Sequence, residues 1–328
     1  MKAFAYERPG TIAEALELGG PDAAYLAGGT NLVDHLRLGI KRPERVIDIN
    51  RLDFGGIDAR EDGSMRIGAN VRNADLAMNA ELRQRFPFVS AALLAGASGQ
   101  LRNMASTGGN LLQRTRCVYF QDRSTPCNKR EPGTGCSAIE GFGRYNALLG
   151  TSEQCVAVHP SDLCVPLAAL DATVHVFGSD GERTIPFRDF HRLPGYTPHL
   201  DTNLAAGELI SAIEIPALSW ARHSSYRKVR ERASYAFALI SVAAALDVAD
   251  GQVRDVRLAL GGVSHKPHRA HTAEQEMRGK PATADTFSRA IEAELADARP
   301  GPENAAKIPQ LRATVPAVLQ QLAEGGRR

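Results

Sequence analysis

The chain has 328 residues and a formal net charge of +2, so its composition gives no general reason to expect nucleic-acid binding. Hydrophobic residues make up 43% and charged residues 23%, as in a globular protein long enough for two domains and a well-buried core. The N-terminus lacks a basic region followed by an apolar run, and no apolar stretch approaches the ~20 residues that cross a bilayer. We therefore expect neither a signal peptide nor a membrane span.

The first third of the chain predicts short helices and strands around a glycine-rich turn. Thr11-Ile12-Ala13-Glu14 is typical of a capping box, which predicts a short helix that ends at Gly19-Gly20. Residues 25–27 indicate a strand that runs into Gly28-Gly29-Thr30-Asn31, and a helix is expected at 32–38. The further expected elements are strands at 45–49 and 65–69 and helices at 73–78 and 88–97.

The rest of the chain predicts a change of architecture after about Trp220. Before this residue we expect an apolar segment at 163–170, a hairpin of strands at 172–177 and 183–187, and a strand at 209–215. After it we expect a strand pair at 237–248 and 253–260 and helices at 272–277, 284–295 and 308–322. This part indicates a smaller α+β domain, and its last residues, 325–328, are expected to fray.

Two glycine-rich turns carry similar chemistry. Ala27-Gly28-Gly29-Thr30-Asn31 and, about eighty residues later, Thr107-Gly108-Gly109-Asn110 each place two glycines beside small polar side chains. Glycines let backbone amides approach an anion, and a helix start adds partial positive charge. One such turn is usually only a tight turn, but two of them suit the two phosphates of a dinucleotide better. The chain has no G-x-G-x-x-G and no G-x-x-x-x-G-K-[ST], which argues against a Rossmann or P-loop site.

Four of the five cysteines, Cys117, Cys127, Cys136 and Cys155, fall in one loop with the spacing C-x9-C-x8-C-x18-C. Cysteines are usually buried apolar residues, but this loop is poor in periodic hydrophobics. In a reducing compartment clustered cysteines more often bind metal than form disulfides. The spacing lacks the close C-x2-C pairs of zinc modules, whereas an iron–sulfur cube needs four thiolates without one obligatory spacing. Iron–sulfur ligation, zinc, and disulfides or free thiols all stay open at this point.

Four motifs resemble the FAD-binding medium subunit of the molybdenum hydroxylases, a family that includes xanthine dehydrogenase, carbon monoxide dehydrogenase and aldehyde oxidoreductase. They are Leu26-Ala27-Gly28-Gly29-Thr30-Asn31-Leu32, Ala105-Ser106-Thr107-Gly108-Gly109-Asn110, Ser161-Asp162-Leu163 and Tyr226-Arg227-Lys228-Val229. Their order and separation match along nearly the whole chain. The cysteine loop, with Asn128-Lys129-Arg130 and Gly135-Cys136-Ser137-Ala138-Ile139, resembles the flavin subunit of the bacterial periplasmic aldehyde oxidoreductase, which carries an additional [4Fe–4S] cluster.

The resemblance implies an α+β fold in two domains. Residues 1–218 would form a two-part FAD-binding domain of the vanillyl-alcohol-oxidase (PCMH) type, with a [4Fe–4S] loop at about 113–158, and residues 219–328 the smaller C-terminal domain. The implied FAD-binding residues are Leu26, Ala27, Gly28, Gly29, Thr30, Asn31, Leu32, Ser106, Thr107, Gly108, Gly109, Asn110, Asp162 and Lys228. The implied cluster ligands are Cys117, Cys127, Cys136 and Cys155.

Four single residues have competing interpretations. Asp162 would bind sugar hydroxyls of FAD in the family; the alternative is that Ser161 or Asp162 caps the helical segment that follows. Lys228 matches a family lysine near the flavin ring, where an ammonium would stabilise negative charge, but it lies in a basic stretch of the kind that is usually solvated. No residue is assigned with certainty as catalytic. Cys164 reads as a buried thiol and His159 is not expected to bind metal, because four cysteines complete a cube.

The resemblance implies an electron-transfer subunit of a molybdenum-dependent aldehyde oxidoreductase that is active only in complex. Electrons from a large subunit with the molybdenum cofactor and a small subunit with two [2Fe–2S] clusters would pass through FAD to an external acceptor. The expected assembly is a heterotrimer, either exported to the periplasm with a signal-bearing partner or cytoplasmic. The rival interpretations are a stand-alone flavin oxidase of the same fold and a non-catalytic scaffold with structural metal or disulfides.

Overall fold

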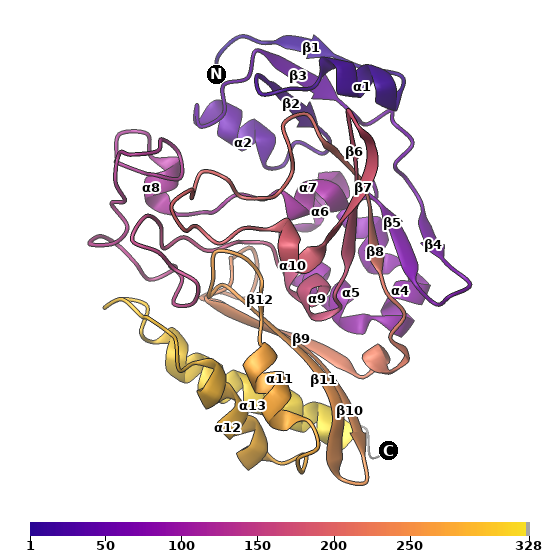
Figure 1. The fold of residues 1–328 in the computed structure, drawn as a ribbon, viewed down its shortest axis with the longest axis vertical. Helices are drawn as coiled ribbons and strands as arrows, with labels where there is room; N and C mark the ends of the chain where they lie inside the picture. The colour runs from indigo at the N-terminus through magenta and orange to yellow at the C-terminus, as the bar shows by residue number, and fades with distance from the viewer. Residues whose placement is uncertain (326–328) are drawn as a thin grey trace.

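The computed structural model describes residues 1–325, and the predicted fraying of residues 326–328 lies outside the described part. The N-terminal layer is a parallel three-stranded sheet in the order β1-β3-β2, flanked by two helices (Figure 1). Its elements are β1 (Ala5–Glu7), α1 (Ile12–Leu18), β2 (Ala23–Leu26), α2 (Leu32–Arg37) and β3 (Arg45–Asp48). The Thr11 hydroxyl accepts the Glu14 amide at 3.2 Å, as predicted, but the Glu14 carboxylate accepts from Gly10 at 2.7 Å instead of from Thr11.

The second layer is an antiparallel five-stranded sheet in the order β4-β5-β8-β6-β7, covered by short helices. Its strands are β4 (Ile57–Ala59), β5 (Met65–Gly68), β6 (Thr173–Gly178), β7 (Gly181–Pro186) and β8 (Leu209–Ile215). Its helices are α3 (Asn73–Met78), α4 (Ala80–Arg85), α5 (Pro87–Ala95), α6 (Gly99–Met104), α7 (Thr107–Leu111), α8 (Val118–Gln121), α9 (Cys164–Ala169) and α10 (Phe187–Phe190). The long segment around α8 that carries the cysteines projects to one side of this layer (Figure 1).

The C-terminal part is an antiparallel sheet in the order β12-β11-β10-β9 with three helices on its outer face (Figure 1). It comprises a 3-10 turn at Ser219–Arg222, β9 (Ser224–Val229), β10 (Ile240–Ala249), β11 (Gln252–Gly261), β12 (His268–Arg269), α11 (His271–Met277), α12 (Ala284–Glu294) and α13 (Lys307–Gly325). Among residues 1–325, no helix combines the length and the apolar character that a membrane crossing needs.

Strand β10 is buried on both faces, which explains its almost continuous apolar sequence. Ala243 and Ala245 pack into the core of the first domain, whereas Val242 and Leu246 pack into the core beneath α11–α13. Successive side chains of a strand point to opposite faces, so the small alanines let the first domain approach closely while the larger residues fill the second core. This strand therefore joins the two hydrophobic cores.

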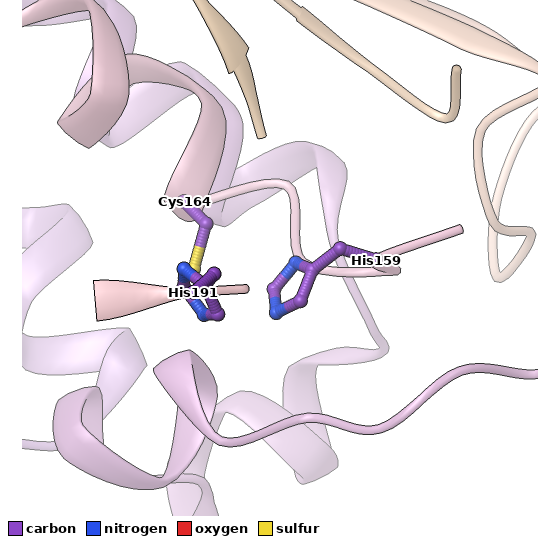
Figure 2. Close-up of side chains that lie close together, drawn as sticks. All are labelled: His159, Cys164 and His191. Carbon is purple, nitrogen blue, oxygen red and sulfur yellow. The ribbon is translucent and has the colours of Figure 1, made fainter. Parts of the chain in front are cut away.

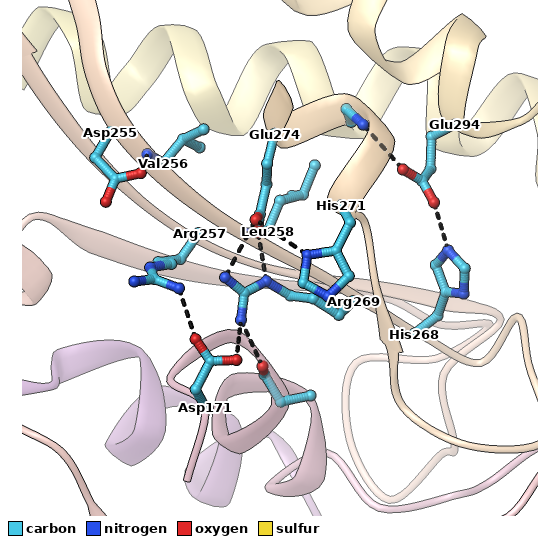
Figure 3. Close-up of polar contacts among 12 residues, drawn as sticks. Asp171, Asp255, Val256, Arg257, Leu258, His268, Arg269, His271, Glu274 and Glu294 are labelled. Carbon is cyan, nitrogen blue, oxygen red and sulfur yellow. Dashed lines mark hydrogen bonds and ion pairs between the residues drawn. The ribbon is translucent and has the colours of Figure 1, made fainter. Parts of the chain in front are cut away.

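A polar cluster fastens the two parts at the end of α9 (Figure 3). Asp171 accepts from Arg257 at 2.6 Å and from Arg269 at 3.0 Å, and Arg269 also donates to the Ala168 carbonyl at 2.8 Å. On its other side Arg269 pairs with Glu274 of α11, whose carboxylate also accepts the Leu258 amide at 2.7 Å. Arg269 thus bridges the flank of one domain and the helical layer of the other.

Candidate functional site

The larger cavity has a volume of about 470 Å³, within the range of small-molecule and cofactor sites. Its walls come from the turn between β2 and α2, the start of α7, and the segment between α10 and β8. The residues that line it include Gly28, Gly29, Thr30, Asn31, Leu32, His35, Ser106, Gly108, Gly109, Arg114, His191 and Asp201. Segments far apart in the sequence therefore meet around one elongated space.

The first glycine turn has the geometry of an anion cradle. A Cβ atom on Gly28 would lie 1.9 Å from the Met104 carbonyl oxygen, and Gly29 has a φ of +73°, so both positions favour glycine. Among the described residues, no protein acceptor takes a hydrogen bond from the amides of Gly29, Thr30, Asn31 or Leu32. The buried Nδ2 of Asn31 also has no partner in this part of the chain. Unused donors at the start of α2 are well placed to bind a phosphate group.

The second glycine turn differs from the first, because its amides are already used. Thr107 and Gly108 donate to the carbonyls of Val71 and Ala69 at 2.9 Å each, and Gly109 donates to the Ser106 hydroxyl at 3.2 Å. Ser106, Gly108 and Gly109 line the cavity, whereas Thr107 and Asn110 do not. The two turns face one cavity, but only the first offers free amides, an asymmetry that the sequence did not reveal.

The four loop cysteines, Cys117, Cys127, Cys136 and Cys155, line one small second cavity of about 10 Å³. All are free thiols, and no three of their sulfur atoms lie within 4.8 Å of one another among the described residues. A single zinc ion with Zn–S bonds of about 2.3 Å would bring its sulfurs to roughly 3.8 Å from one another. The four thiols therefore line one cavity with their sulfurs spaced more widely than a single zinc ion requires.

Burial raises the pKa of three of the thiols, to about 12 for Cys155 and in the same direction for Cys117 and Cys136. Apolar surroundings disfavour the thiolate, and metal ligation supplies the positive charge that stabilises it. The buried thiols are therefore expected to lose their protons when a metal cation binds between them.

Backbone contacts hold the cysteine loop in place. The Asn128 side-chain oxygen accepts from the amides of Gly133 and Gly135 at 3.1 and 2.8 Å. The Arg130 guanidinium donates to the carbonyls of Tyr119 and Phe120 at 2.6 and 2.9 Å. Such contacts of a side chain with backbone groups elsewhere in the loop leave no pattern in a single sequence.

Asp162 and Lys228, which we predicted separately as FAD-binding residues, meet each other. The Lys228 ammonium donates to the Asp162 carboxylate at 2.8 Å and to the Ala95 carbonyl at 3.2 Å, and the Tyr226 hydroxyl donates to Asp162 at 2.6 Å. Neither residue lines the 470 Å³ cavity. Asp162 therefore acts here as the partner of Lys228 and Tyr226, and its predicted contact with sugar hydroxyls stays a prediction.

His159, Cys164 and His191 form a compact group of possible metal ligands beside the cavity (Figure 2). Their ligand atoms lie within 4.8 Å of one another, but the set stops at three; Cys164 and His191 are buried, and His159 is half-buried. The His159 and His191 rings contact each other with centroids 4.3 Å apart, and His191 Nε2 donates to the Leu111 carbonyl at 2.9 Å. Burial lowers the pKa of His191 to about 4, so the ring is neutral at pH 7. We interpret the group as packing that supports α7.

Comparison with known proteins agrees with this geometry. The family model for the FAD binding domain in molybdopterin dehydrogenase matches residues 2–218, and the model for the CO dehydrogenase flavoprotein C-terminal domain matches residues 224–321. The chain is 49% identical to the aldehyde oxidoreductase FAD-binding subunit PaoB of Escherichia coli K12, over 98% of both chains. It is 30% identical to the glyceraldehyde dehydrogenase medium chain of Sulfolobus acidocaldarius, over 84% of this chain and 82% of the relative.

Solved structures share the fold. Quinoline 2-oxidoreductase from Pseudomonas putida 86 superposes with a TM-score of 0.76 at 22% identity, covering 100% of both chains. Carbon monoxide dehydrogenase from Hydrogenophaga pseudoflava gives a TM-score of 0.72 at 24% identity, covering 97% of this chain and 95% of that one. The predicted α+β fold, an FAD-binding domain followed by a smaller C-terminal domain, is confirmed. The chain belongs to the FAD-binding subunits of the molybdenum hydroxylase family, to which the aldehyde oxidoreductase and xanthine dehydrogenase complexes belong.

Proposed function

We propose that this subunit holds FAD in the 470 Å³ cavity and a [4Fe–4S] cluster between the four loop cysteines, and that it relays electrons within an aldehyde oxidoreductase complex. The observation that carries the proposal is that Cys117, Cys127, Cys136 and Cys155 all line one small cavity beside the larger one. The two cavities have a common wall, since His35 of the larger one contacts Phe120 of the smaller one with ring centroids 5.9 Å apart.

The two groups divide the chemistry, because FAD carries two electrons and also exchanges them singly, whereas the cluster carries one at a time. The residues of this chain bind and orient both groups. Free amides at Gly29–Leu32 bind a phosphate of the dinucleotide, and the glycines keep the backbone close to it. Lys228 lies on β9, and its contacts with Asp162 and the Ala95 carbonyl hold its ammonium group against the FAD-binding domain.

Replacing each loop cysteine tests the ligand set. Cys136→Ser, and likewise the changes at the other three positions, removes one thiolate and should abolish the binding of about four irons per chain. Cys164→Ser is the matched control, because this buried thiol lies outside the small cavity. Iron analysis of the purified variants decides the matter. Full iron in a loop variant, or loss of iron in the Cys164 variant, contradicts the assignment.

The proposal places substrate oxidation on partner subunits. Relatives are named as FAD-binding subunits or medium chains, which supports a complex that also contains a molybdenum-cofactor large subunit and a [2Fe–2S] small subunit. The isolated chain should then oxidise no aldehyde, while its chemically reduced flavin still passes electrons to an acceptor dye. Adding the two partner subunits should restore aldehyde-dependent flavin reduction. Aldehyde turnover by this chain alone, with no molybdenum by metal analysis, would favour a stand-alone oxidase.

A further inference from the structure

The wall between the two cavities contains a charge bridge, in which Lys129 is buried and Asp201 is 28% exposed. Arg114 and Asp201 line the larger cavity, and Lys129 lines the cavity of the cysteines. Asp201 Oδ2 accepts from Arg114 Nε at 2.6 Å, and Asp201 Oδ1 forms an ion pair with Lys129. One carboxylate therefore contacts a cation of each site.

Asp201 is the only acidic partner of Arg114 and Lys129 in the part of the chain that the structure describes. Burial alone would raise the pKa of Asp201, but Lys129 and Arg114 outweigh burial and hold it well below its usual range, so the carboxylate is ionised. The Lys129 side chain is only 2% exposed and also donates to the Pro198 carbonyl at 3.0 Å. Its other close neighbour is His265 Nε2 at 2.9 Å. This ring is uncharged at pH 7, because burial lowers the pKa of His265 to about 4.

The same residues are also fixed by aromatic contacts. The Arg114 guanidinium carbon lies 4.7 Å from the centre of the Phe120 ring, and Phe120 is fully buried in the wall of the cysteine cavity. Arg114 also donates to the Lys129 carbonyl at 3.3 Å. Several contacts besides the ion pairs with Asp201 therefore hold Arg114 and Lys129 in the wall.

We propose that Asp201 is a positioning residue that couples the two redox sites, holding Lys129 beside the cysteines and Arg114 beside the flavin cavity while its negative charge lowers the reduction potential of both groups. The predicted effect on the cluster rests on the proposed function, whereas the predicted effect on the flavin requires only that the chain binds FAD. Reduction adds negative charge to each group, and a fixed carboxylate nearby disfavours that change. Loss of the charge should therefore shift both potentials in the same direction.

The test is a spectroscopic redox titration of Asp201→Asn in the assembled complex, with the flavin and cluster bands followed separately. We expect reduction of both groups to become easier, by about tenfold in the equilibrium constant, or about 59 mV for a one-electron couple. Asp201→Glu restores the charge and should restore both potentials. Asp189→Asn removes an equal charge from a 58% exposed side chain away from both cavities and should move neither.

A second variant separates charge from damage. Lys129→Gln removes a cation from the same bridge, so it should make reduction of the cluster harder, the opposite of the change at Asp201. If Asp201 and Lys129 had only a structural role, both variants would retain less FAD or iron, and the shift in the cluster potential would not change sign between them. Shifts confined to one group, or equal in sign for both variants, would overturn the coupling. A wild-type chain without iron would instead refute the proposed function and leave the flavin shift of Asp201→Asn as the remaining test.

Discussion

At the residue scale, Gly29 combines a positive φ with a place in the anion cradle, so a substitution there must separate strain from charge. A side chain at this position meets Leu26 and Val33 at 3.2 Å each. Asn and Asp have nearly the same shape and both tolerate the left-handed region. We expect Gly29→Asp to bind FAD at least about tenfold more weakly than Gly29→Asn, because only Asp places a negative charge against the phosphates.

FAD content after gel filtration, followed by titration of the apoprotein with FAD, measures this difference. Equal affinity of the two variants would refute the phosphate role of this turn. Gly99→Asp is the glycine control for added charge, since Gly99 also starts a helix but has open space around it and lies outside the cavity. Gly39, a helix-end glycine, is less suitable, because its φ of +71° and its contact with Arg123 add strain.

His191 predicts a loss of stability in acid. Its folded-state pKa is about 4, below the ordinary value of 6.5, because burial disfavours the charged ring. Between pH 6.5 and 4 the unfolded chain binds a proton that the folded chain does not, so the free energy of unfolding decreases as the pH falls, by about 1.4 kcal/mol per pH unit. Thermal unfolding midpoints from pH 7 to 4 should fall less steeply for His191→Gln. Parallel profiles of the two proteins would contradict this origin.

At the element scale, the cluster around Arg269 predicts unequal effects from its two acids. Glu274 is 1% exposed, so Glu274→Ala would leave Arg269 buried without its main partner and should cost about 3–5 kcal/mol. Asp171 is 49% exposed, so Asp171→Asn, which suits its φ of +51°, should cost less than about 1 kcal/mol. Chemical unfolding measures both. Similar costs would show that the domain contact does not depend on the buried pair.

Helix α13 predicts a pH dependence of the same sign in a more alkaline window. Its buried Lys307 donates to the carbonyls of Asn146 and Gly262 at 2.8 and 2.7 Å, which ties the end of the cysteine loop to the C-terminal domain. Burial lowers the pKa of Lys307 from 10.5 to about 7. Between these values the unfolded chain binds the extra proton, so the free energy of unfolding should increase as the pH rises through this window. The unfolding midpoints of Lys307→Met should lack this rise, and an unchanged profile would disprove the assignment.

Most long elements could be predicted from the sequence, and short ones could not. The strand pair β10 and β11 follows from two apolar runs around Asp250-Gly251, and α12 follows from its amphipathic pattern. Strand β9 was missed because its basic residues resemble a solvated stretch, and α6 and α7 because their few residues include glycines. Local patterns identify an element only where it is long enough to repeat them.

At the scale of the whole molecule, the cysteine loop and the two glycine turns were singled out because each is a local feature of the sequence. The bridge through Asp201 was not, since it joins segments 87 residues apart and no local pattern marks such a pair. The same holds for the Asp162–Lys228 pair, which are 66 residues apart and were assigned two separate roles. Predicting such contacts requires the topology, which brings the segment before α8 to the loop before β8, and the segment before α9 to β9.

The central claim, that one chain carries both FAD and a [4Fe–4S] cluster, is tested most directly by counting electrons. The purified full chain is titrated anaerobically with dithionite, and the uptake is divided by its FAD content. Two electrons for FAD and one for the cluster predict about three per chain, with a broad absorbance near ~400 nm that bleaches apart from the flavin bands. An uptake of about two electrons, with flavin bands alone, would contradict the account.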